Sequence, residues 1–276
     1  MGSARGRGAS VSVCYLGHQV VVRAEKERVV QRVAHSFAAM LAAGPALSCE
    51  VLEIRPDGEN HVLLCDGAPV FVDADPGEVQ RTLRHEIIRA FVRAHPHLLW
   101  LHAGAAVRDG RAVLFVGPYG RGKSTLVTRL CARGWSYVSD DVVPVDLCAG
   151  RVLPFPLTPI VREAVAEELP PERVSELRKV KVALPRERYH RDPVPIGGVV
   201  LPAYRAGVGA RAQPYSPAAV ALDIVREGIN REQHGQASVA LCARLVGEVP
   251  VLPLLFSDAE AAADLVEQRL AERPGR

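Results

Sequence analysis

The chain has 276 residues, of which 48% are hydrophobic and 24% charged, and its formal net charge is +3. This composition is typical of a globular protein, and the charge is too small to indicate a nucleic-acid partner. No apolar run reaches the length of a membrane span, and the first residues lack the apolar segment of a secretory signal, so we expect a cytoplasmic protein without a membrane partner. The six cysteines are scattered without a Cys-x-x-Cys pair, which argues against a zinc or redox motif and predicts that most are buried small hydrophobes.

The first 96 residues predict a small α+β domain that follows a basic tail, residues 1–9. Hydrophobic spacing predicts a β segment, a helix and then three short strands, which are separated by Pro-Asp-Gly and Asp-Gly turn residues and form an antiparallel meander. These segments are 11–22, 23–41, 49–54, 61–65 and 69–72. A last helix is expected over 77–94, with Glu86 among the charged residues of its outer face.

From residue 97 to residue 276 the pattern predicts a larger α/β domain. One apolar strand is expected over 98–107, and the Asp109–Gly110 turn leads into a second strand, 112–116, so that the two form an antiparallel hairpin in a mixed sheet. The remaining expected strands are 135–141, 142–147, 151–155 and 196–201, and the remaining helices are 216–226 and 258–270. The charged segment 163–191 is either a solvated surface or a mobile lid over a nucleotide.

The most specific motif fits G-x-x-x-x-G-K-[ST] and lies between an apolar strand and a helical pattern, as a phosphate-binding loop requires. Glycines let the backbone wrap closely around a triphosphate, so that N–H groups and the helix N-terminus face the anion. Lys123 would reach the β- and γ-phosphates, and the Ser124 hydroxyl would take one Mg²⁺ position. The residues expected to bind a nucleoside triphosphate are therefore Gly117, Pro118, Tyr119, Gly120, Arg121, Gly122, Lys123, Ser124 and Thr125.

Phosphoryl transfer also needs a metal ligand and a group that takes the acceptor's proton. Asp140 and Asp141 follow the loop at a strand end and are the natural candidates, although Asp141 could instead cap the following segment. Neighbouring strand residues point to opposite sides, so we expect one carboxylate at the metal and nucleotide and the other at the acceptor. His102 lies inside an apolar strand, where it is either a core histidine or a group that orients Asp140 for proton abstraction.

Taken together, Leu101-His102-Ala-Gly-Ala, the loop, and Tyr137-Val-Ser-Asp140-Asp141 resemble the bacterial HPr kinase/phosphorylase family, whose P-loop fold is related to phosphoenolpyruvate carboxykinase. The resemblance implies that His102 and Asp140 form the catalytic pair, with Asp140 as the base towards a serine hydroxyl. It also implies that Lys123 holds the phosphates of ATP and that Ser124 and Asp141 serve Mg²⁺. A homo-oligomer is implied as well.

The chain departs from that family in two places. Its loop ends Lys-Ser-Thr where those kinases read Lys-Ser-Glu, and no segment clearly matches their second, Glu-x-Arg-Gly signature. We therefore do not carry over phosphorolysis or HPr as the substrate. The chain is more similar to HPr-kinase-like proteins of peptide natural-product pathways, including lasso peptides, in which a Gly-Trp-x-Tyr-x-Ser-Asp segment is followed by Gly-Arg-Val-Leu-Pro-Phe-Pro.

Three functional hypotheses follow. The preferred one is an ATP-dependent kinase that phosphorylates a serine of a peptide or small protein, with Asp140, His102 and Lys123 as catalytic residues. The second is a kinase of the same fold that acts on a free amino acid or sugar. The third is a nucleotide-binding regulator without turnover, which would have no need of a base.

Overall fold

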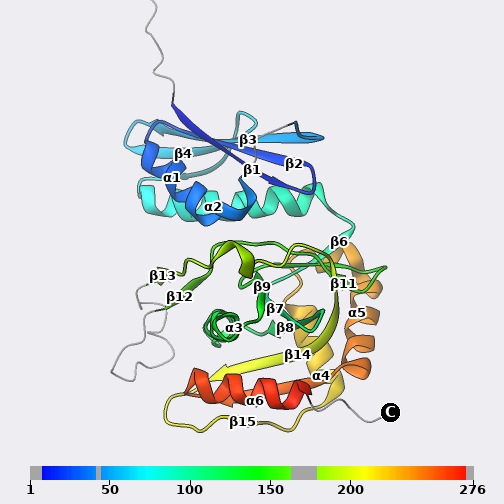
Figure 1. Ribbon diagram of the computed structural model, residues 1–276. Helices are drawn as coiled ribbons and strands as arrows, with labels where there is room; N and C mark the ends of the chain where they lie inside the picture. The colour runs from blue at the N-terminus through cyan, green and yellow to red at the C-terminus, as the bar shows by residue number, and fades with distance from the viewer. Residues whose placement is uncertain (1–7, 42–44, 163–178, 272–276) are drawn as a thin grey trace, which may run out of the picture. The chain divides into compact units, whose positions relative to one another are not determined.

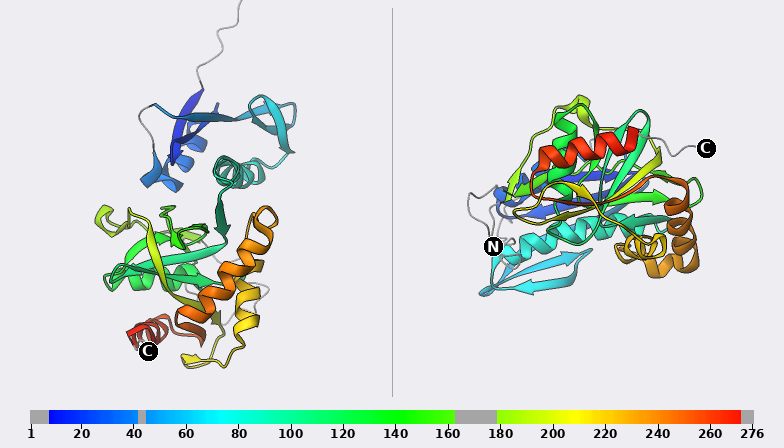
Figure 2. Two further views of the ribbon diagram at one scale, coloured as in Figure 1. Left: turned by 90° about the vertical axis from the view of Figure 1, so that its right-hand side faces the viewer. Right: turned by 90° about the horizontal axis from the view of Figure 1, so that it is seen from below.

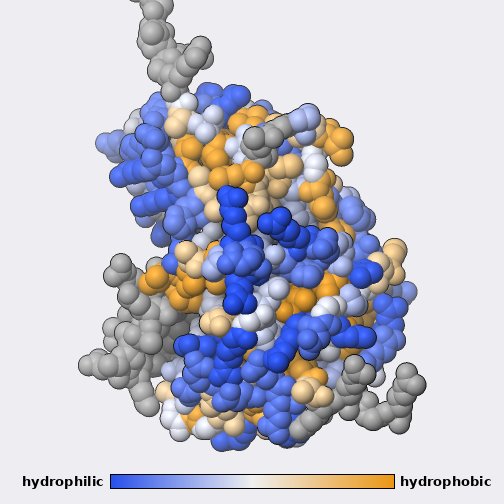
Figure 3. All heavy atoms as spheres, viewed as in Figure 1, coloured by the Kyte–Doolittle hydropathy of each residue, from blue (hydrophilic) through white to orange (hydrophobic). Residues whose placement is uncertain are grey.

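The computed structural model describes residues 8–41, 45–162 and 179–271. The chain forms two compact units, Met1–Pro96 and His97–Arg276 (Figure 1). Among the described residues, none of the helices is long and apolar enough to cross a membrane. On the face seen in Figure 3, hydrophobic and hydrophilic residues are interspersed.

The N-terminal unit is a five-stranded sheet in the order β1-β2-β3-β4-β5, with helices packed against it. Strands β2 and β3 are parallel, and the other neighbouring pairs are antiparallel. Its elements are β1 (Ala9–Tyr15), β2 (His18–Ala24), α1 (Glu27–Ser36), the short 3₁₀ helix η1 (Ala38–Met40), β3 (Ser48–Asp57), β4 (Asn60–Cys65), β5 (Ala68–Asp73) and α2 (Pro76–Ala94).

Two predictions for this unit need correction. The expected β segment 11–22 is a hairpin, because Leu16 and Gly17 both take positive φ angles and reverse the chain between β1 and β2. Glu86 is not on the outer face of α2: its residue is 7% exposed, and its carboxylate pairs with Arg89 and Arg93. The expected meander of three short strands is confirmed, and the expected basic tail lies mostly outside the described residues.

The larger unit is built on a mixed nine-stranded sheet with a path β6-β10-β11-β14-β8-β7-β9, to which β16 and then β15 are added beside β14. Strand β14 is parallel to β8 and to β16, whereas the other pairs are antiparallel. Its strands are β6 (Leu98–Leu101), β7 (Ala103–Arg108), β8 (Arg111–Val116), β9 (Ser136–Ser139), β10 (Val143–Asp146), β11 (Arg151–Val152), β14 (Val194–Tyr204), β15 (Arg211–Ala212) and β16 (Val251–Phe256). A separate ribbon joins β12 (Ile160–Arg162) to β13 (Lys179–Lys181).

Helices cover both faces of this sheet, as the two views of Figure 2 show. Buried residues of α4 (Pro217–Arg226) and α5 (Arg231–Glu248) share one apolar cluster, and those of α3 (Lys123–Ala132) and α6 (Ala259–Ala271) share the other. Strand β8 is buried on both sides, because Leu114 faces the first cluster and Phe115 the second. The expectation of an α/β fold with a mixed sheet is confirmed.

Several elements of this unit differ from expectation. The predicted single strand 98–107 breaks at His102, so that β6 pairs with β10 while β7 pairs with β8 and β9. The expected hairpin is confirmed for β7 and β8. Helix α5, strand β16 and the ribbon of β12 and β13 were not expected, and the 3₁₀ helix η3 (Arg186–Arg188) lies in the charged segment, of which 163–178 falls outside the described residues.

The cysteines are less buried than predicted. Cys131 and Cys242 are buried, and burial raises the pKa of each thiol to about 12, so both are inert apolar side chains at neutral pH. Cys14 and Cys65 are half-buried, and Cys49 and Cys148 are exposed.

Candidate functional site

The phosphate-loop motif occupies the turn between β8 and α3, where three glycines take positive φ angles. These angles are 145° at Gly117, 85° at Gly120 and 94° at Gly122. A Cβ atom on Gly122 would lie 2.6 Å from Cζ of Phe256, so both the backbone angle and the space require glycine there. The N-cap residue of α3 is Gly122, which has no side chain with which to cap the first-turn N–H groups of the helix. The loop therefore fits a polyphosphate.

The ammonium group of Lys123 lies inside this loop, and the residue is only 6% exposed. Its Nζ donates to the carbonyl oxygens of Gly117 at 2.5 Å and Pro118 at 3.2 Å. It also lies 3.1 Å from Nε2 of His102. An ammonium group can only donate, so Nε2 accepts and His102 carries its proton on Nδ1.

His102 occupies the break between β6 and β7, and its Nδ1 lies 3.4 Å from Oδ1 of Asp141. Burial lowers the pKa of His102 below its ordinary value of 6.5, and the charge of Lys123 lowers it further, whereas Asp141 and Glu227 act in the opposite direction. The net shift is downward, so the imidazole is neutral at pH 7. Lys123, His102 and Asp141 thus form one chain of polar contacts that begins in the phosphate loop.

The structure pairs His102 with Asp141, whereas the sequence prediction paired it with Asp140. Asp140 is only 4% exposed, and its carboxylate accepts from the hydroxyl of Tyr137 at 2.9 Å and from the main-chain N–H of Ile160 at 3.0 Å. Strand β9 ends at Ser139, so the strict alternation of a strand does not apply to the two aspartates. The side chain of Asp141 is 29% exposed and is the more accessible of the two.

Asp140 instead holds together the segments around the loop. The Ser124 hydroxyl donates to its main-chain carbonyl at 3.3 Å, which ties the first turn of α3 to the end of β9. Tyr137, which is fully buried, lies 2.8 Å from the Leu157 carbonyl, and burial followed by the charge of Asp140 raises the pKa of its hydroxyl well above the ordinary value. The carboxylate of Asp140 therefore anchors the chain that leads to β12.

The connection between α4 and α5 holds the backbone at His102, and no local sequence pattern predicts this. The N–H of His102 donates to the Glu227 carbonyl at 2.7 Å, and that of Ile229 donates to the Trp100 carbonyl at 2.7 Å. The buried side chain of Asn230 continues this pairing: it accepts from the Trp100 N–H and donates to the Leu98 carbonyl, both at 2.9 Å. Residues 227–230 thus act as a further strand on the free edge of β6.

The other residues that were predicted to bind the nucleotide or Mg²⁺ lie along the loop, in the first turn of α3 and just beyond the end of β9. Pro118, Tyr119, Arg121 and Thr125 are exposed along the loop and the first turn of α3, and Tyr119 is 60% exposed at its tip. Of the two residues assigned to Mg²⁺, Ser124 contacts the Asp140 carbonyl just beyond the end of β9, and Asp141 is the next residue along the chain. A hydroxyl and a carboxylate are suitable Mg²⁺ ligands.

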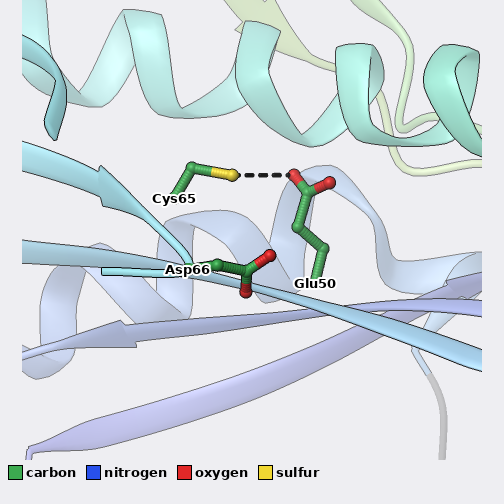
Figure 4. Close-up of side chains that lie close together, drawn as sticks. All are labelled: Glu50, Cys65 and Asp66. Carbon is green, nitrogen blue, oxygen red and sulfur yellow. Dashed lines mark hydrogen bonds between the residues drawn. The ribbon is translucent and has the colours of Figure 1, made fainter. Parts of the chain in front are cut away.

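A second group of potential metal ligands lies in the N-terminal unit, where donor atoms of Glu50, Cys65 and Asp66 lie within 4.8 Å of one another (Figure 4). Burial raises the pKa of the Cys65 thiol to about 11, and the thiol donates to Glu50 at 3.3 Å. Glu50 also accepts from Arg93 at 2.6 Å, and Asp66 accepts from the Val51 N–H at 2.8 Å. Protein partners thus account for this group without a metal.

A scan against models of known protein families finds no match to this chain, and a search of curated protein sequences finds none either. The candidate site is therefore defined by its sequence motif and its geometry.

Proposed function

We propose that the chain is an ATP- and Mg²⁺-dependent kinase that phosphorylates a serine hydroxyl of a peptide or small protein, such as a natural-product precursor peptide. The observation that carries the proposal is the chain of contacts from Lys123 through His102 to Asp141, which starts inside a loop suited to a polyphosphate. The resemblance to HPr-kinase-like proteins supports both the serine acceptor and a P-loop core of the HPr-kinase and phosphoenolpyruvate-carboxykinase type for residues 97–276.

In the proposed reaction, the acceptor oxygen forms a bond to the terminal phosphorus of ATP while the bond from that phosphorus to the β-phosphate oxygen breaks and ADP leaves. The hydroxyl proton passes to Asp141, which the Nδ1–H of His102 orients. Lys123 and the loop N–H groups stabilise the charge on the transferred group. The Ser124 hydroxyl would be a ligand of Mg²⁺, which would neutralise phosphate charge when bound, whereas Asp141, as the base, would not be a second ligand.

The geometry favours Asp141 over Asp140 as the base. Both carboxylate oxygens of Asp140 already accept from protein donors, and the residue is only 4% exposed, so little of this carboxylate is open to a substrate hydroxyl. The carboxylate of Asp141 is partly exposed beside a neutral imidazole. We therefore assign Asp140 to positioning and Asp141 to proton transfer.

The proposal is tested by phosphate transfer from γ-labelled ATP with Mg²⁺ to peptides encoded beside the gene, read by intact-mass spectrometry. Asp141→Asn should lower transfer by about 10²- to 10⁴-fold, the usual contribution of a general base, while thermal stability and ATP binding stay close to wild type. Asp140→Asn places an amide NH₂ against one of two donors, so it should lower stability by about 1–3 kcal/mol while the folded fraction retains transfer.

The reverse pattern, with transfer lost in a folded Asp140→Asn variant and kept in Asp141→Asn, would show that the base is Asp140. Transfer only to free amino acids or sugars would replace the peptide acceptor by a small molecule. Tight ATP binding without transfer to any hydroxyl would indicate a nucleotide-binding regulator.

A further inference from the structure

The parallel strands of the larger unit end beside the phosphate loop. Strand β8 leads directly into the loop and is parallel to β14; both strands are labelled in Figure 1. Strand β16 is in turn parallel to β14. The last residue of β14, Tyr204, donates its N–H to the Arg121 carbonyl at 3.3 Å. Two residues earlier, the carbonyl oxygen of Pro202 lies 3.9 Å from the position that a Cβ on Gly117 would take. In open sheets, ligands bind at such carboxyl ends of strands.

The two sides of β8 differ in chemistry. On one side lie β7 and then β9, which bring His102 and Asp141 to the loop. On the other side lie β14 and β16. The ends of β14 and β16 therefore lie on the opposite side of β8 from His102 and Asp141, which the proposed function places at the terminal phosphate.

The ring of Tyr204, at the end of β14, is held by packing and yet is partly exposed. The residue is 47% exposed, and its ring packs edge-on against Phe256, with ring centroids 5.9 Å apart and an angle of 80° between the planes. Phe256 is itself buried against Gly122, and its carbonyl accepts from the Arg205 N–H at 2.8 Å. The Tyr204 ring is thus held by Phe256, which itself packs against Gly122 of the loop. Little side-chain entropy is therefore lost when the exposed part of the ring contacts a ligand.

We propose that Tyr204 is the platform on which the base of the bound nucleoside triphosphate stacks. Stacking on an aromatic ring tolerates different bases, so the ligand class is a nucleoside triphosphate, and the ring distinguishes it from an inorganic polyphosphate. This inference rests on the proposed nucleotide site but adds a residue outside the loop motif.

The experiment compares Mg²⁺-ATP with Mg²⁺-tripolyphosphate by isothermal titration of the full chain. Tyr204→Ala should weaken ATP binding about tenfold, which is typical of removing a base-stacking ring, and leave tripolyphosphate binding unchanged. Tyr204→Phe should bind both ligands as wild type does. Tyr215→Ala is the matched control: Tyr215 is 46% exposed, and it follows the pairing of Gln213 with Pro253, which runs towards the start of β16 and away from the loop.

Three results would overturn the inference while the proposed function stands: unchanged ATP affinity in Tyr204→Ala, an equal loss of tripolyphosphate affinity, or wild-type protein that binds ATP no more tightly than tripolyphosphate. An ATP-selective loss in Tyr119→Ala alone would move the base to the tip of the loop and also overturn it. Failure of the wild-type chain to bind either ligand would remove the proposed function itself. Thermal unfolding of each variant shows whether it is folded.

Discussion

Replacing Gly122 by alanine tests the loop geometry directly. The residue has a φ of 94°, which costs an alanine about 1–2 kcal/mol, and its Cβ would lie 2.6 Å from Cζ of the buried Phe256, an overlap that typically costs a further 1–3 kcal/mol. Gly122→Ala should therefore lower the free energy of unfolding of the larger unit by about 2–5 kcal/mol. Because the loop must shift to relieve the overlap, ATP affinity should fall as well.

Urea unfolding followed by tryptophan fluorescence measures this loss, because both tryptophans of the chain, Trp100 and Trp135, belong to the larger unit. Gly247→Ala is the matched control: a Cβ there meets nothing within 4 Å, so this helix position should be unchanged or stabilised by up to about 1 kcal/mol. In a Phe256→Leu background the packing part of the Gly122→Ala loss should shrink, and the part due to backbone strain should remain. A Gly122→Ala variant within about 0.5 kcal/mol of wild type that binds ATP normally would refute this account of the loop.

Three further predictions concern the residues around His102. Lys123→Met removes the cation that helps lower the pKa of His102, so this pKa should be higher than in wild type. NMR titration of the His102 imidazole C2 proton measures it, and an unchanged titration would exclude the Lys123–His102 contact. Burial and Lys123 lower the pKa of His102 in the folded state, so His102 contributes stability above pH ~6.5 that is lost as the pH falls below that value. In His102→Gln, the free energy of unfolding should decline less steeply over this pH range. Asn230→Ala leaves the buried Trp100 N–H without this partner, whereas the Leu98 carbonyl keeps Nε2 of His234 at 3.0 Å. Urea unfolding should therefore show a loss of about 1–3 kcal/mol, and a loss below about 0.5 kcal/mol would show that Asn230 does not hold β6.

The sequence allowed prediction wherever a local rule determines the structure. The loop motif, the hairpin around Asp109–Gly110 and the helix 77–94 each rest on residues that are close together in the chain. The break at His102 could not be predicted in this way, because the residues on both sides of His102 in 98–107 are apolar and no local signal says that a strand changes partner there. Helix α5 was missed because Gly235, with a φ of 45°, interrupts it near its start, and strand β16 because it contains a proline.

The pairing of the two aspartates illustrates the same limit. The sequence prediction was that both lie near the loop and that Asp140 faces His102, whereas the structure pairs His102 with Asp141. That choice depends on Tyr137, which lies three residues before Asp140, and on the Ile160 N–H, which lies 20 residues after it. A long-range hydrogen bond from an unpredicted ribbon therefore decides which carboxylate is accessible.

The break at His102 also limits how the chain can vary in length. In β7, Ala105 and Val107 face one apolar cluster, and Ala106 between them faces the other. Because side chains alternate along a strand, adding or deleting one residue between Leu101 and Ala103 would exchange these faces along β7. Each side chain of β7 would then point into the apolar cluster that its neighbour in the sequence now faces. Related chains with this fold should therefore keep a constant number of residues between β6 and β7, even where the histidine itself is replaced.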